Sequence, residues 1–70
     1  MTKFEEFAKE INVPILKDKY GWYTGITKAL ANATNEIILS DNDRIFNLDW
    51  EEQKEMIKER FYKTFPYMKK

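Results

Sequence analysis

The side chains that could do chemistry in this sequence are carboxylates, lysines, tyrosines and hydroxyls. The 70 residues include no Cys and no His. Thiolate nucleophiles, disulfides, Cys/His zinc sites and His-based acid–base catalysis are therefore excluded. An enzyme would have to act through carboxylates, Lys or Tyr alone. The sequence predicts a protein that binds a partner, is not an enzyme and needs no cofactor.

One acidic cluster invites comparison with a metal site. The run Asp41-Asn42-Asp43-Arg44 begins like a calcium-binding loop. Such a loop needs Gly at its sixth position and Glu at its twelfth. Here Phe46 is sixth and Glu52 is twelfth. A turn rich in Asp and Asn explains the cluster, and we predict no metal site.

A second group of polar side chains lies along a predicted helix from about Tyr23 to Ala33. Its apolar face consists of Trp22, Ile26, Ala29, Leu30 and Ala33. The side chains off this face include Tyr23, Thr24, Thr27 and Lys28. Hydroxyl and ammonium groups on an exposed helix face can bond to base edges in the DNA major groove. Gly25, inside this predicted helix, would cost about 1 kcal/mol relative to Ala.

The segment preceding this helix predicts how it would be positioned. Pro14 can occupy the first turn of a short helix over 14–20, and Gly21 can end that helix in a tight turn. A short helix, a Gly-containing turn and a second helix outline a helix-turn-helix at about 14–33.

An earlier helix precedes this motif. Thr2 and Glu5 form a capping box, and Asn12 with Pro14 ends the helix. Its apolar face is formed by residues spaced three and four apart, Phe4, Phe7, Ala8 and Ile11.

The second half of the sequence predicts a small β-hairpin and a C-terminal helix. Two β-prone runs flank an Asp/Asn turn over about 36–48. Asp49 and Glu52 form a second capping box, which starts a helix over about 49–65. The predicted fold class is mainly α (α+β), with three N-terminal helices, a hairpin and a C-terminal helix in a single domain, 1–70.

Charge and hydropathy limit the partners and the location. The net charge is zero. Residues 36–55 carry seven acidic and two basic residues, whereas residues 56–70 carry five basic residues and one acidic residue. The helix dipole accounts for part of this gradient. No apolar run approaches the roughly 18 residues of a membrane span, and no secretory signal precedes the first helix. We therefore expect a cytoplasmic protein without a membrane partner.

A family resemblance rests on the run from Trp22 to Ala33 followed by Ile37-Ile38-Leu39. This run resembles the recognition helix and first hairpin strand of the Cro-type small helix-turn-helix repressors of lambda-like phages. The tail, residues 63–70, is similar to the C-terminal arm of that family. The resemblance implies a sequence-specific DNA-binding transcriptional regulator that binds double-stranded DNA, often as a homodimer.

The same resemblance implies roles for individual residues. Base contacts fall on Tyr23, Thr24, Thr27 and Lys28. Phosphate contacts fall on Lys17, Lys69 and Lys70, and a dimer contact falls on Phe65.

An alternative function stays open. A small phage or mobile-element protein that binds and modulates another protein, without touching DNA, fits the neutral charge and the many aromatic residues. Trp and Tyr are favoured anchors at protein interfaces. The candidate anchors are Trp22, Tyr23, Tyr62 and Tyr67.

Overall fold

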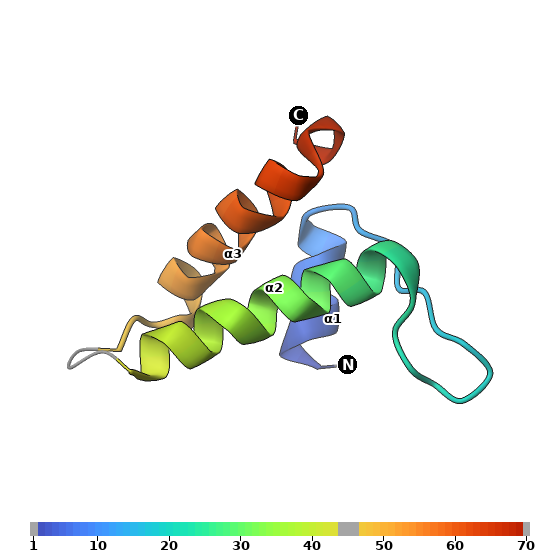
Figure 1. The fold of residues 1–70 in the computed structure, drawn as a ribbon, viewed down its shortest axis with the longest axis horizontal. Coiled ribbons are helices and arrows are strands. Elements are labelled where there is room, and N and C mark those ends of the chain that lie inside the picture. The colour runs from blue at the N-terminus through green and yellow to red at the C-terminus, as the bar shows by residue number, and fades with distance from the viewer. Residues whose placement is uncertain (1, 44–46, 70) are drawn as a thin grey trace. The chain divides into compact units, whose positions relative to one another are not determined.

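The computed structural model describes residues 2–43 and 47–69, and Figure 1 shows their helices in chain order. Helix α1 spans Lys3–Glu10, α2 spans Gly25–Asn42 and α3 spans Trp50–Thr64. A short 3-10 helix, η1, follows at Pro66–Met68. The chain divides into two compact units, residues 1–32 and 33–70, with the boundary inside α2.

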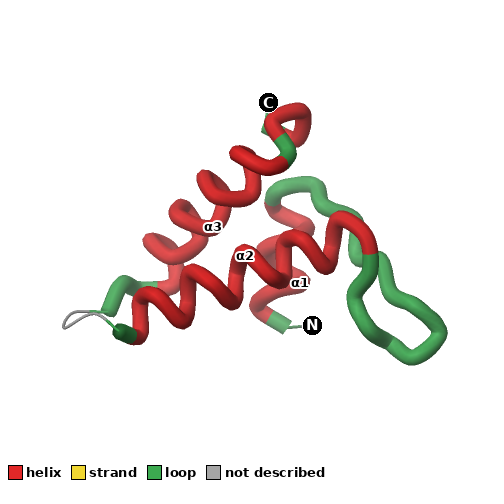
Figure 2. The backbone as a smooth tube through the Cα atoms, viewed as in Figure 1, coloured by secondary structure: helices red, strands yellow, loops and turns green. Residues whose placement is uncertain are grey.

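The predicted β-hairpin is wrong. Residues 36–42 belong to helix α2, and the described residues contain no strand, as the colouring of Figure 2 shows. Part of the expected second strand, residues 44–46, lies outside the described residues. The described part of the chain is therefore mainly α, as predicted, but without the β component.

The predicted helix-turn-helix is also wrong, because its first helix does not form. Residues 14–20 lie in a loop, and α2 begins at Gly25, two residues later than predicted. Gly25 has a positive φ of +57° and starts α2, so it does not lie in a helix interior.

Helix α1 follows the local signals of its sequence. The Thr2 side chain accepts a hydrogen bond from the Glu5 N–H at 3.1 Å, and Glu5 bonds back to the Thr2 backbone, which confirms the capping box. Phe7 and Ala8 are buried. The helix ends at Glu10, and Asn12 then takes a left-handed φ of +61°.

Helix α2 is held by a buried stripe with helical spacing. The stripe consists of five buried side chains on one face of the helix, Thr27, Leu30, Ala33, Thr34 and Asp41. Ile37 and Ile38 are half-buried between Thr34 and Asp41. One face of α2 is thus buried along its length, although several of its members are polar.

Within the second unit, residues 33–70, polar contacts join the end of α2 to the start of α3. The buried Asp41 carboxylate accepts from the Leu48 N–H at 3.0 Å and from the Gln53 amide at 2.7 Å. Asp49 caps α3 by accepting from the Glu52 N–H at 2.9 Å. Asp41 therefore ties the end of α2 to the residues that begin α3.

Apolar side chains complete this unit. Ile57 and Phe61 on α3 are buried. The ring of Phe61 lies 5.1 Å from that of Phe65, between centroids. Across residues 2–43 and 47–69, no helix combines the length and apolar character that crossing a membrane requires.

Candidate interaction loop

Residues 14–24, in the segment between α1 and α2, form a loop called here the aromatic loop (Figure 2). Lys17 and Tyr23 form an antiparallel bridge. The Asp18 N–H donates to the Trp22 carbonyl at 2.9 Å, and the Thr24 N–H donates to the Leu16 carbonyl at 3.0 Å. The loop therefore folds back on itself as a very short hairpin.

The tip of the aromatic loop is shaped by Asp18. Its Oδ1 accepts from the Tyr20 N–H at 2.9 Å and from the Trp22 N–H at 3.0 Å. The Gly21 N–H donates to the Asp18 carbonyl at 3.0 Å, and Gly21 has a φ of +84°. A turn followed by a left-handed Gly is a common three-residue hairpin connection. These hydrogen bonds give the tip one defined backbone path.

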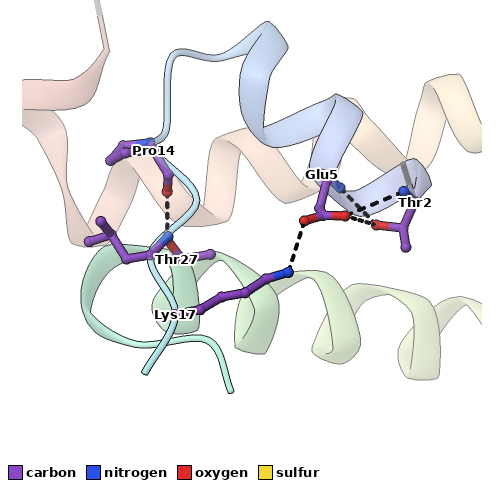
Figure 3. Close-up of polar contacts among 6 residues, drawn as sticks. Thr2, Glu5, Pro14, Lys17 and Thr27 are labelled. Carbon is purple, nitrogen blue, oxygen red and sulfur yellow. Dashed lines mark hydrogen bonds and ion pairs between the residues drawn. The ribbon is translucent and has the colours of Figure 1, made fainter. Parts of the chain in front are cut away.

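Thr27 fastens the base of the aromatic loop to α2. Its hydroxyl donates to the Pro14 carbonyl at 2.6 Å, as Figure 3 shows, and accepts from the Leu16 N–H at 2.8 Å. The Thr27 side chain is fully buried. A single side chain thus bonds to two backbone groups of the loop.

Lys17 ties the other side of the aromatic loop to α1. Its ammonium lies 3.4 Å from the Glu5 carboxylate (Figure 3) and 5.5 Å from the centre of the Tyr23 ring. The Tyr23 ring in turn packs on Phe4, with centroids 5.0 Å apart. The hydrogen bond from the Thr2 N–H, together with the Lys17 ammonium, holds the pKa of Glu5 below its ordinary value of 4.5.

The side chains displayed by this fixed backbone are large and exposed. Tyr20 and Trp22 are each 73% exposed, and Leu16 is 42% exposed. The Lys19 ammonium lies 5.1 Å from the centre of the Tyr20 ring. The loop therefore presents two aromatic side chains and a cation to the surroundings.

The predicted base-reading residues do not form one exposed surface. Thr27 is buried and its hydroxyl is already bonded twice, so a DNA base cannot use it. Tyr23 and Thr24 are half-buried in the aromatic loop, and only Lys28 is exposed. The four residues therefore do not lie together on one exposed helix face.

The remaining predicted residues belong to both compact units. Lys17 is exposed but engaged with Glu5. Phe65 is half-buried against Phe61 within its own chain. Lys69 is exposed, and Lys70 lies outside the described residues.

The predicted aromatic anchors also separate into two groups. Trp22 and Tyr67 are exposed, at 73% and 71%. Tyr23 and Tyr62 are half-buried. Trp22 is the only one of the four that combines high exposure with a position on the aromatic loop.

Sequence reasoning missed Asp18 and Tyr20. The signal was present: Asp at the first position and Gly at the fourth position of Asp18-Lys19-Tyr20-Gly21 is a preferred β-turn pattern. It was hidden because Pro14 and Gly21 also bracket a plausible short helix.

Neither a metal site among the described residues nor a family match assigns a function to this chain. In the part of the chain that the structure describes, no three Asp or Glu side chains are grouped as a metal site would require. Comparison with family models, with curated proteins and with solved structures found no match. The function is therefore argued from the loop itself.

Proposed function

We propose that this protein is a protein-binding module that engages its partner through the aromatic loop. The observation that supports this proposal is the 73% exposure of Trp22 and Tyr20 on a backbone held by its own hydrogen bonds. Exposed Trp and Tyr side chains that become buried on association supply a large part of the binding energy at many interfaces.

The order of the loop strengthens this argument. Fixing a flexible loop on binding costs conformational entropy, and a loop that is already ordered avoids much of that cost. Asp18 holds the tip, while Thr27 and Lys17 hold the two sides of its base. Trp22 and Tyr20, held on this hydrogen-bonded backbone, are therefore suited to binding a partner protein.

Sequence-specific duplex DNA binding is less well supported. A helix-turn-helix places a recognition helix in the major groove with exposed polar side chains at its start. Here the motif's first helix is replaced by the aromatic loop, and Thr27 is buried. Lysines alone can contact phosphate, but such contacts position a protein without specifying sequence.

The proposal is tested by affinity capture from nuclease-treated extract with matched variants. Trp22→Ala removes the loop aromatic, and Tyr67→Ala removes an aromatic of similar exposure, 71%, in the other unit. We expect a partner that is retained by the wild type and by Tyr67→Ala and is lost with Trp22→Ala. Equal retention by all three proteins would refute the assignment of the aromatic loop. Retention from untreated extract that disappears after nuclease treatment would favour nucleic acid instead.

A further inference from the structure

The charge around the aromatic loop narrows the chemistry of its partner. Residues 12–28 carry Lys17, Lys19 and Lys28 against a single acidic residue, Asp18. The Asp18 carboxylate is used within the loop, where it accepts from two backbone N–H groups. Asp18 keeps its negative charge, and Lys17 is paired with Glu5 of α1. With Glu5 counted, three lysines stand against two carboxylates, a small positive balance in a chain whose net charge is zero.

Two lysines of the aromatic loop lie close to tyrosine rings of the same loop. The Lys19 ammonium lies 5.1 Å from the centre of the Tyr20 ring, and the Lys17 ammonium lies 5.5 Å from that of Tyr23. Trp22 follows Tyr20 by two residues and is equally exposed, at 73%. A ligand that contacts the tip therefore meets the Tyr20 ring and the Lys19 ammonium together.

We propose that the aromatic loop binds an acidic, aromatic-bearing segment of a partner protein, a refinement that rests on the proposed function. Carboxylates of the segment pair with Lys19 and Lys28, and its rings pack on Trp22 and Tyr20. Rings packed in this way gain offset or edge-to-face contact in addition to buried area. Complementary charge contributes register and association rate more than raw affinity.

Defined polymers test this chemistry, because each polymer carries only some features of the proposed segment. The full chain carrying Trp50→Phe keeps Trp22 as its only Trp, so Trp emission reports on the loop. The probes are a random Glu–Tyr copolymer, polyglutamate, a random Lys–Tyr copolymer and a single-stranded oligothymidine. We expect the Glu–Tyr copolymer to shift Trp22 emission to shorter wavelength and to bind at least about tenfold more tightly than polyglutamate or the Lys–Tyr copolymer.

Matched charge variants complete the test. Lys19→Glu places an acid at the tip, and Lys63→Glu makes the same change at an exposed position on α3. We expect Lys19→Glu to weaken binding of the Glu–Tyr copolymer severalfold and Lys63→Glu to leave it unchanged. Equal weakening by both variants would show that only net charge matters and would overturn the loop assignment.

The remaining outcomes separate the inference from the proposed function. Equal affinity for polyglutamate would overturn the aromatic part of the inference, and equal affinity for the Lys–Tyr copolymer would overturn the acidic part. Tightest binding to oligothymidine would replace the protein segment with single-stranded nucleic acid, whose bases also stack on exposed aromatic rings. Failure with every polymer would overturn the inference, while the capture experiment decides independently whether a protein partner binds the loop.

Discussion

Thr27 shows how one hydroxyl can change the function that a sequence suggests. Beside Lys28 on a predicted helix, it is a reasonable group to read a DNA base. In the structure it is buried, donates to the Pro14 carbonyl and accepts from the Leu16 N–H. Its neighbours in sequence do not distinguish these roles, because the partners are 11 and 13 residues away. The role of Thr27 is therefore structural: it holds the aromatic loop.

Replacing Thr27 by Val tests this structural role. Val keeps the shape but removes both part-buried hydrogen bonds, leaving a backbone N–H and a carbonyl without this partner. We expect the free energy of unfolding to fall by about 1–3 kcal/mol, measured by urea denaturation. Thr64→Val at an exposed position is the control and should stay within about 0.5 kcal/mol of wild type. A Thr27→Val protein as stable as wild type would contradict the assignment.

Glu5 gives a pH dependence at the same scale. Its folded-state pKa is lowered below 4.5, first by the Thr2 N–H and then by Lys17. A lowered pKa means that the ionised carboxylate stabilises the fold, and that this stabilisation is present above pH 4.5 and is lost as the pH falls through the lower folded-state value. We expect the urea midpoint to fall on acidification below pH 4.5, and less steeply in Glu5→Gln.

The control for this effect is Glu6→Gln, which removes one carboxylate from the same helix at an exposed position. If Glu5→Gln and wild type lost stability in parallel between neutral pH and about pH 3, the carboxylate of Glu5 would not be the group responsible.

At the scale of elements, the largest correction concerns α2. Ile37-Ile38-Leu39 favours a strand by composition, yet these residues extend a helix to Asn42. The reason is the buried stripe that runs along one face of the helix from Thr27 to Asp41. Its period is helical, but Thr27, Thr34 and Asp41 are polar, so an apolar pattern search does not detect it. The capping box of α1, by contrast, depends on Thr2 and Glu5 alone and was predictable.

Gly25 offers a test of where α2 begins. In a helix interior, Gly→Ala would stabilise the protein by about 1 kcal/mol. At a φ of +57°, and with an added Cβ 3.4 Å from a Leu16 methyl, the same change should destabilise it by about 1–2 kcal/mol. Thermal unfolding of Gly25→Ala measures the sign. Asn32→Ala, at an exposed position inside α2, is the control and should raise the stability by a few tenths of a kcal/mol, about 0.5 at most.

For the whole molecule, charge and surface point to different partners. The chain as a whole is neutral, with acidic residues concentrated over 36–55 and basic residues over 56–70. Duplex DNA affinity comes largely from phosphate neutralisation, which requires basic residues gathered on one surface. Of the predicted DNA contacts, Lys17 is paired with Glu5, and Lys28 is exposed in the first turn of α2. The aromatic loop lies entirely within one compact unit.

Selection from a random duplex library tests DNA recognition by the intact protein. We expect no enriched sequence motif, and an affinity for any single duplex that falls severalfold or more between about 50 and 200 mM salt, as phosphate contacts alone produce. Fluorescence anisotropy with Lys28→Ala measures the contribution of the exposed lysine on α2. An enriched motif whose binding requires Lys28 would support a sequence-specific regulator and count against the protein-binding proposal.

The absence of Cys and His, the start of α1 and the mainly helical class follow from the sequence by itself, because each depends on composition or on residues within one turn of each other. The path of residues 14–24 was decided by tertiary structure. Asp18 and Gly21 favour a turn, and Pro14 favours a helix start. Thr27 and Glu5 bond to the loop from α2 and α1 and resolve this conflict. Trp22 and Tyr20 are exposed because residues 14–24 form this loop. A helix in its place would have buried part of these two side chains.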